Sequence, residues 1–265
     1  MSGFRPVLVV CWINLILLSV TAQQVSPPAT SAAALLQQSL VVQIGNIQIS
    51  DVILIGTARR IAGSDDESGT VTLKVLSSTA ARLDFNFPSG PRSEFRLPRQ
   101  DNPTGGWSGP DGIVHLIANH NLISDWAWFP VFTLAASSRD SNYAVTIIGS
   151  ETRNGQSVIH LSVSQQFPSL SSDTAILMSH LSQTDIFLDA TTRLPRSILY
   201  NTHPDNNDLL DIPVELQFSD YRAVNGAQIP FHIQKFFNNS LAFDLQFQNA
   251  ALNTGLTAAQ IGGAQ

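Results

Sequence analysis

The sequence predicts a mainly β fold built on one large, curved antiparallel sheet. The main observation is a period of two in residues 184–247, where apolar and polar side chains alternate over four or five successive segments. Such alternation is typical of antiparallel strands with one buried face and one wet face. Asn225-Gly226 and Asn238-Asn239 separate segments of this region, and both pairs accept the positive φ angles of tight hairpin turns. A mature chain of about 240 residues is long enough for a single domain of this class.

Residues 1–22 have the organisation of a secretory signal peptide. Arg5 supplies a positive start, residues 7–18 are almost wholly apolar, and Ala22 ends a run of small residues suited to cleavage. The apolar run is too short to span a bilayer comfortably, which favours a cleaved signal over a membrane anchor. We therefore expect a periplasmic or secreted protein without a transmembrane anchor. Residues 23–32, rich in Pro, Ser and Ala, are predicted to form a flexible mature N-terminus.

The composition excludes several classes of function. The single cysteine, Cys11, lies inside the signal segment, which excludes disulfides, thiolate catalysis and cysteine metal sites from the mature chain. The formal net charge is −6, and only 13% of the residues are charged. A mildly acidic chain of this kind has no electrostatic footprint for nucleic acid or for an anionic membrane. We expect no nucleic-acid partner.

The same patterns predict a single domain over residues 33–253. Thr30 or Ser31 is expected to cap a short helix that carries Leu35, Leu36 and Leu40. Further strands are expected at 51–60, 69–76, 81–87, 93–97 and 113–117, a hairpin at 143–164 and a short helix at 171–181. The acidic segment 62–69 is predicted to be a solvated hairpin tip, and residues 254–265 are predicted to fray.

The most aromatic stretch, residues 119–136, has no β period and is predicted to be helical. Ser124 or Asp125 is expected to cap this helix, with Pro130 near its start or at a kink. Two interpretations stay open, a helix that fills the open side of the sheet or a lid over an apolar cavity. Trp107, in a segment dense in Gly and Pro, is expected to pack rather than to line an entrance.

Six histidines raise the question of metal binding or acid–base catalysis. His115 and His120 have neither the spacing of a helical zinc pair nor that of alternate strand residues, so ordinary histidines are favoured. Segment 203–208 has enough oxygen atoms for a hard cation but lacks the calcium-loop pattern, and it is expected to be a hairpin tip. No nucleophile elbow or phosphate-binding glycine loop is present. The sequence therefore predicts no catalytic residue, no metal site and no cofactor, and the protein is not expected to be an enzyme.

Two patterns in the last third of the chain resemble a known family. The first is Asp185-Ile186-Phe187-Leu188-Asp189 before a turn with Pro195, and the second runs from Phe218 to Gly226, followed by Ile229-Pro230-Phe231. They resemble the periplasmic lipoprotein-carrier superfamily (LolA/LolB-like), especially its divergent secreted bacterial members. The resemblance implies an open half-barrel of about eleven strands, helices over its concave face, and an apolar cavity for acyl chains. In the carriers an arginine of the early strands hydrogen-bonds the lid helix, and neither Arg59 nor Arg60 can be matched to it.

Two function classes follow from the sheet and the resemblance. The first is a monomeric periplasmic or secreted carrier for an apolar ligand, such as acyl chains or a lipoprotein. The alternative is an envelope protein-interaction or sensing module with a filled core and an exposed patch elsewhere. A hydrolase would require His, Asp and Ser brought into one cleft by the fold. On the carrier hypothesis the cavity is lined by Leu83, Phe85, Phe87, Ile186, Leu188, Tyr200, Phe218, Phe231 and Phe243, with Trp126, Trp128 and Phe129 at its mouth or lid.

Overall fold

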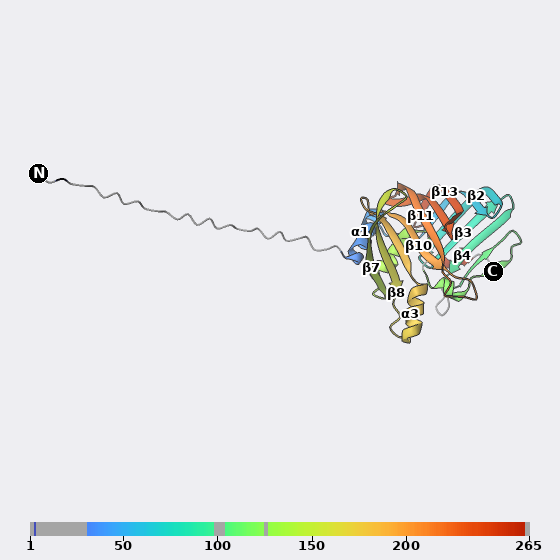
Figure 1. Ribbon diagram of the computed structural model, residues 1–265. Coiled ribbons are helices and arrows are strands. Elements are labelled where there is room, and N and C mark those ends of the chain that lie inside the picture. Colours follow the sequence, from blue (N-terminus) through green and yellow to red (C-terminus); the bar gives the residue numbers. More distant parts are fainter. Residues whose placement is uncertain (1–2, 4–30, 98–103, 125–126, 263–265) are drawn as a thin grey trace.

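The computed structural model describes residues 3, 31–97, 104–124 and 127–262, so the predicted signal peptide lies outside the described residues except for Gly3. The strands are β1 (Val52–Ala62), β2 (Asp65–Ser77), β3 (Ala80–Phe87), β4 (Gly90–Leu97), β5 (Thr104–Ser108), β6 (Val114–Leu116), β7 (Tyr143–Arg153), β8 (Gln156–Gln165), β9 (Thr184–Asp189), β10 (Pro195–Thr202), β11 (Ile212–Val224), β12 (Ala227–Phe237) and β13 (Ser240–Leu252). They form one antiparallel sheet in the order β6-β5-β4-β3-β2-β1-β13-β12-β11-β10-β9-β8-β7. The edge strands β6 and β7 do not pair with each other, so this strongly curled sheet is open (Figure 1). The predicted mainly β class is confirmed, with thirteen strands in place of about eleven.

The region with the clearest alternation, β9 to β13, folds as predicted. Its inward residues, among them Ile186, Leu216 and Ile233, are fully buried. The turn between β11 and β12 has φ angles of 49° at Asn225 and 89° at Gly226. Positive φ at both central positions is typical of the type I′ turn, whose twist matches that of the flanking strands. The polar turn residues therefore set the register that buries every second side chain.

The acidic segment after β1 contains the exposed hairpin tip that the sequence predicts, but the turn is shorter than residues 62–69. Residues 65–69 belong to β2. Asp66 accepts hydrogen bonds from Arg59, with a shortest distance of 2.6 Å, and Glu67 accepts one from Arg60 at 3.1 Å. Each carboxylate stands opposite or diagonal to an arginine of β1, so cross-strand pairing extends the hairpin into a segment that is rich in charge. Arg59 and Arg60 form these ion pairs with β2, and through them neither arginine contacts a helix.

Two helices, α1 (Ala32–Ile44) and α2 (Pro130–Arg139), pack against each other over the concave face of the sheet. Ser31 caps α1 as predicted, since its Oγ accepts a hydrogen bond from the Ala34 amide at 3.2 Å. Helix α2 begins at Pro130, and Ser124 lies outside it, so the prediction that Ser124 caps this helix is wrong; Asp125 lies outside the described residues. Proline is favoured at the first helical position because its φ is already helical and its missing N–H is not needed there.

The C-terminal segment is held against the sheet, so the prediction of fraying is wrong for residues 254–262. The Asp51 carboxylate accepts hydrogen bonds from the Thr254 amide at 2.8 Å and from the Gly255 amide at 3.0 Å. Burial by itself raises the pKa of Asp51, but these hydrogen bonds outweigh it and hold the pKa below its usual value. Beyond them, the short helix α4 (Ala258–Gly262) contacts β2, β3 and β4, and Ile261 is fully buried.

The sheet curls so far that strands distant in its order face each other. The rings of Phe85 on β3 and Phe243 on β13 stack with centroids 5.0 Å apart, although β2 and β1 lie between these strands. The register between β1 and β13 shifts at Gly56, and a bulge of this kind bends the strand and contributes to the curvature. The position requires glycine, because a Cβ there would lie 2.1 Å from the Gln246 carbonyl oxygen. Two smaller helices complete the fold, η1 (Asn119–Leu122) and α3 (Ser172–Leu181), and α3 projects from the body of the molecule (Figure 1).

Candidate functional site

The concave face carries charged side chains at one end, on β4. Antiparallel residues that stand directly opposite each other project to the same face of a sheet. Glu94 stands opposite Leu83 and Arg96 opposite Ala81, and both partners on β3 are fully buried in the core. Alternate residues of β4 thus place charged side chains on the concave face. The residues directly opposite them on β3 place apolar side chains on the same face.

Lys235 places a further charge on this face, from the opposite side of the fold. It follows the buried Ile229 and Ile233 at strand spacing on β12. Its Nζ lies 3.1 Å from Glu94 Oε2, although four strands separate β12 from β4 in the sheet. The same Nζ lies 5.1 Å from the centroid of the Trp128 ring, within the range of a cation–π interaction. Burial lowers the pKa of Lys235, but the Glu94 carboxylate outweighs burial and raises the pKa above its usual value of 10.5.

A cavity of about 590 Å³ opens beside this ion pair, between β4–β6 and β10–β12. Its lining combines charged groups with apolar and aromatic ones, and includes Glu94, Arg96, Lys235, Asp205, Trp107, Tyr200, Leu116, Ile212, Val214 and Phe237. A second cavity of about 260 Å³ shares Glu94 and Trp107 with the first and extends along β1 and β13 to Arg60, Arg92, Phe85 and Phe243. Four cations and two carboxylates line the two cavities together.

Trp107 lies at the rim of both cavities, so the expectation that it packs in the core is wrong. It belongs to β5, a strand inside the Gly-rich segment, and is 45% exposed. Its ring stacks on His115 of β6 with centroids 4.2 Å apart. The glycines beside it, Gly105 and Gly106, have no Cβ and therefore leave room for the side chains of Leu122 and Phe95, which pack directly against the backbone of β5.

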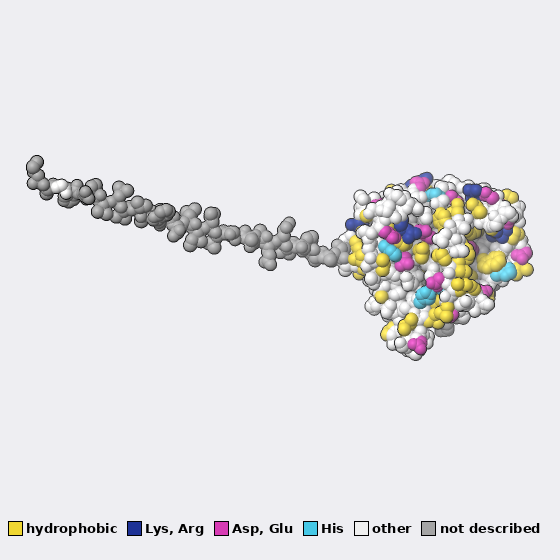
Figure 2. Space-filling view, in the orientation of Figure 1, with side chains coloured by type: hydrophobic (Ala, Val, Ile, Leu, Met, Phe, Trp, Pro, Cys, Tyr) yellow, Lys and Arg dark blue, Asp and Glu magenta, His cyan; other side chains and the backbone are white. Residues whose placement is uncertain are grey.

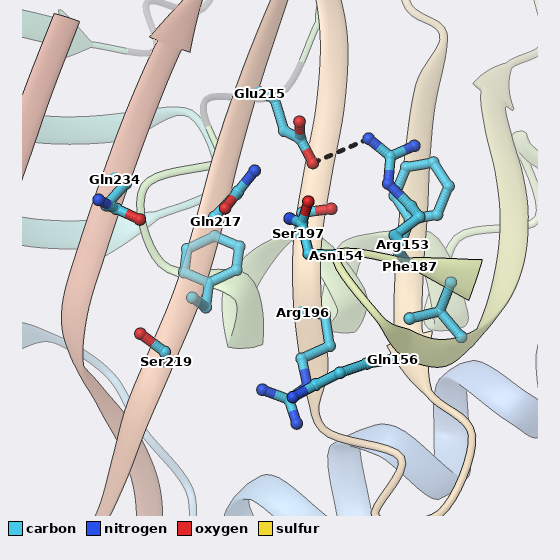
Figure 3. A pocket seen from close by; sticks show the side chains of 12 residues that line it. Arg153, Asn154, Gln156, Phe187, Arg196, Ser197, Glu215, Gln217, Ser219 and Gln234 are labelled. Carbon is cyan, nitrogen blue, oxygen red and sulfur yellow. Dashed lines mark hydrogen bonds and ion pairs between the residues drawn. The ribbon is translucent and has the colours of Figure 1, made fainter. Parts of the chain in front are cut away.

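A smaller pocket of about 170 Å³ lies on the outer face of the sheet, near the tip of the β7–β8 hairpin (Figure 3). Arg153 donates a hydrogen bond to Glu215 at 3.0 Å, and its guanidinium carbon lies 4.0 Å from the centroid of the Phe187 ring. Amide and hydroxyl side chains complete the lining, among them Gln217 and Ser219. This pocket is small and is crossed by a formed ion pair, so the inner cavities are the stronger candidate site.

Comparisons with solved structures identify the type of fold. A LolA superfamily protein from Nitrosomonas europaea matches with a TM-score of 0.52 and 9% identity, over 88% of this chain and 98% of that one. A DUF1329 family protein from Desulfovibrio piger matches with a TM-score of 0.54 and 11% identity, over 87% and 95% of the two chains. This chain therefore has a LolA-like fold. No protein-family profile matches its sequence, and no curated protein matches it either. Among its described residues, no helix is long and apolar enough to cross a membrane.

The LolA-like fold distributes the predicted cavity residues unevenly. Tyr200 lines the larger cavity, and Phe85 and Phe243 line the smaller one. The core holds Leu83, Phe87, Trp128, Phe129, Ile186, Leu188, Phe218 and Phe231, while Trp126 lies outside the described residues. Trp128 and Phe129 are 0% and 1% exposed, so they fill the core beneath the helices rather than standing at a mouth.

The outer face of the LolA-like sheet brings a Ser, a His and an Asp together that are distant in sequence. His232 Nδ1 lies 2.9 Å from Ser219 Oγ, and its Nε2 lies 2.9 Å from Asp244 Oδ1. Ser219 and His232 stand directly opposite each other on β11 and β12, and Asp244 is diagonal to His232 on β13. Polar pairs of this kind are ordinary between strands with a wet face. Asp244 also accepts a hydrogen bond from Gln234 at 3.0 Å, and we interpret the group as a cross-strand hydrogen-bond ladder.

Sequence reasoning missed the charges of the inner face. Arg92, Glu94 and Arg96 alternate along β4, and this spacing was a usable signal, since it places three charges on one side of a strand. The sequence does not indicate whether these three side chains face the concave side or the outer side of the sheet. Figure 2 shows charged, histidine and hydrophobic side chains interspersed on the visible outer surface, without a continuous patch of one sign.

Proposed function

We propose that this LolA-like chain is a periplasmic or secreted binding or carrier protein that takes an amphiphile with an acyl chain and an anionic headgroup. The observation that carries this proposal is the cavity of about 590 Å³ with Lys235 and Arg96 on its wall. Ligand pockets of about 300–1,000 Å³ that are mainly apolar and hold a few fixed polar groups are typical binding sites for small molecules. The aromatic residues at its wall and rim, Tyr200, Phe237 and Trp107, supply surface for an alkyl chain.

The charges support an anionic headgroup. Four cations and two carboxylates lie on the walls of the two cavities, and Glu67 outside them pairs with Arg60 at 3.1 Å and with Arg92 at 3.8 Å. Burying a charge in an apolar face costs free energy unless it is paired, so inward cations are retained where they contact something. Glu94 pairs with Lys235 at 3.1 Å. A carboxylate or phosphate headgroup entering the larger cavity would meet the same lysine together with Arg96.

The test is ligand binding by the purified protein and by two lysine variants. Native mass spectrometry with lipid extraction should find an acyl species in near-stoichiometric amount, and a fluorescent fatty-acid probe should bind and be displaced by it. Lys235→Met should weaken the binding of the probe about tenfold, since one lost charge-assisted contact is worth about 1.5 kcal/mol or more. The matched control is Lys74→Met, because Lys74 lies on the outer face and pairs with Asp84 at 3.2 Å. Equal binding by both variants would refute the assignment of the headgroup site.

The filled part of the core favours a second candidate, an envelope protein-interaction or sensing module. Trp128 and Phe129 are buried in the core together with Leu134 of α2, as a packed interior requires. If the protein purifies without bound lipid and also fails to take up the fatty-acid probe, this candidate is supported and the carrier proposal is contradicted. Uptake of the probe with an affinity that Lys235→Met reduces would exclude it.

A further inference from the structure

Three titratable side chains from separate segments meet at the lower edge of the larger cavity. His180 lies in the last turn of α3, His203 directly follows β10, and Asp211 directly precedes β11. His180 Nε2 and His203 Nε2 each lie 3.0 Å from the same oxygen, Asp211 Oδ1. One ligand atom of each residue lies within 4.8 Å of the other two. Residues 203–208 lie in the connection of the β10–β11 hairpin, as the sequence predicts, and the His203 side chain there is only 1% exposed.

This geometry is close to that of a metal site. In a tetrahedral zinc site the ligand atoms lie about 2.0–2.1 Å from the ion, and therefore about 3.3–3.4 Å from one another. The two contacts of 3.0 Å to Asp211 need only a small expansion to reach that separation. Two imidazoles and one carboxylate are a donor set that suits borderline divalent ions, Zn²⁺ above all, rather than hard ions such as Mg²⁺.

The surroundings of His203 favour one tautomer of its ring. Asn121 Oδ1 is an acceptor, because it takes the His203 amide at 2.7 Å and the Thr202 hydroxyl at 3.0 Å, while Asn121 Nδ2 donates to the His203 carbonyl at 2.8 Å. His203 Nδ1 lies 3.4 Å from this oxygen, a contact that favours a hydrogen on Nδ1. In that tautomer Nε2 holds a lone pair directed at the Asp211 carboxylate, 3.0 Å away, and a metal ion between the two acceptors would satisfy both.

This arrangement is also the one that metal-binding histidines adopt. Such a residue binds the ion through one ring nitrogen and donates the other N–H to an oxygen that holds the ring in place. Asn121 supplies that oxygen to His203 and is itself anchored to the same residue by two backbone hydrogen bonds.

A third histidine, His120, lies next to the cluster and has an unpaired ring nitrogen among the described residues. The ring centroids of His120 and His203 lie 6.0 Å apart, the same separation as between His180 and His203. His120 Nε2 is buried and has no hydrogen-bond partner among the described residues. Buried polar atoms are nearly always paired, so an unpaired imidazole nitrogen here is a second, independent sign that a polar occupant belongs in this place.

We propose that His180, His203 and Asp211 bind one Zn²⁺ ion, with Asn121 as the residue that orients His203 and with the fourth position open to water. The ion would join α3 to the loop between β10 and β11. Among the described residues of α3 only Leu181 is buried, and the helix is otherwise tied to β8 through a hydrogen bond from Ser179 Oγ to the Gln165 carbonyl at 2.8 Å. His203 lines the larger cavity, and the zinc site therefore fixes one wall of it.

The experiment is a zinc titration of the protein after chelator treatment, with metal content measured by mass spectrometry and affinity by calorimetry. We expect one equivalent of Zn²⁺ and no saturable binding of Mg²⁺ under the same conditions. His180→Gln and Asp211→Asn should each weaken Zn²⁺ binding at least tenfold, and Asn121→Leu about tenfold or more through the ring of His203. The side chains of His180 and Asp211 are 37% and 43% exposed, so these two variants should fold normally.

The matched control is His232→Gln, which removes a ring that is likewise 2.9 Å from a single aspartate but lies on the outer face. It should bind Zn²⁺ as the unaltered protein does. Addition of Zn²⁺ should also protect α3 from limited proteolysis in the unaltered protein and not in Asp211→Asn. No saturable binding by the unaltered protein, or equal binding by it and the two ligand variants, would overturn the proposal.

Discussion

Replacement of Lys235 by methionine should destabilise the fold, because Glu94 then keeps its charge in a poorly solvated place without a cation. The two side chains are 14% and 22% exposed, and their charged atoms lie 3.1 Å apart. Removing one partner of a buried ion pair costs about 3–5 kcal/mol. The remaining exposure puts this pair at the lower limit, so we expect a loss of about 3 kcal/mol. For a domain of this size the melting temperature should fall by about 6–12 °C.

A double-mutant cycle separates this effect from simple loss of packing. Glu94→Gln added to Lys235→Met removes the unpaired charge and should bring stability back to within about 1 kcal/mol of the unaltered protein. Unfolding in urea can be followed by tryptophan fluorescence, with the transition midpoints compared at equal slope. Lys74→Met is the control, since the side chains of Lys74 and Asp84 are 27% and 36% exposed and such pairs contribute under about 1 kcal/mol.

Two outcomes would refute this account of the inner ion pair. One is a loss for Lys235→Met no larger than that for Lys74→Met, which would mean that the Lys235 charge is well solvated. The other is failure of Glu94→Gln to restore stability to the Lys235 variant. In that case the lysine would act through its alkyl chain and its contact with the Trp128 ring rather than through its charge.

Two further predictions concern the core and the acid response of the fold. Trp128→Ala should cost about 3–5 kcal/mol in urea unfolding, because the ring is fully buried, and a loss below about 1 kcal/mol would return the aromatic segment to the lid interpretation. Burial raises the pKa of Asp189, but hydrogen bonds from Thr192, Arg196 and Thr191 outweigh it and lower the pKa from 3.8 to about 2. Because the folded value lies below the unfolded one, this carboxylate stabilises the fold above pH 3.8 and loses that contribution as the pH falls through about 2. Asp189→Asn should therefore flatten the acid branch of the stability curve, and an unchanged acid branch would contradict the assignment.

The sheet could be predicted from the sequence because its information is local. A period of two identifies a strand with one buried face, and pairs such as Asn225-Gly226 identify the turn that sets the register. The same local reasoning gives the wrong limits where charge and conformation disagree. The tip predicted for residues 62–69 is shorter than expected, because Arg59 and Arg60 on the neighbouring strand pair with Asp66 and Glu67 and extend β2. The predicted start of α2 is wrong because Pro130 occupies the first helical position, where its fixed φ begins the helix without a capping side chain.

The candidate sites could not be predicted because they depend on contacts between distant segments. Glu94 and Lys235 are 141 residues apart in the chain, and their contact requires the whole sheet to curl. His180 and Asp211 are 31 residues apart and meet only because α3 and the loop after β10 lie at the same end of the sheet. Spacing rules detect ligands that share one helix or one strand, and these residues share neither.

The two ends of the concave face differ in what covers them, and this difference explains where the cavity lies. At one end α1 and α2 supply buried side chains such as Leu36 and Leu134, and the aromatic pair Trp128-Phe129 fills the space beneath them. At the other end the cover is made of η1 and loops, which bring few apolar side chains. An apolar sheet face without a helix over it would stay exposed to water, and large exposed apolar areas are unfavourable in a soluble protein.

Inward-facing charges allow water to contact this end of the sheet without filling the cavity. The Glu94–Lys235 pair lets water enter the cavity at low cost while the alkyl parts of both side chains cover the aromatic surface. On the carrier proposal an incoming anion would share Lys235 with Glu94 or displace it, and a displaced Glu94 carboxylate would then be solvated by the water in the cavity. A cavity of purely apolar lining would bind an alkyl chain as well, but it would not distinguish an anionic amphiphile from a neutral one. That selectivity is the property by which the Lys235 variant differs most sharply from its outer-face control.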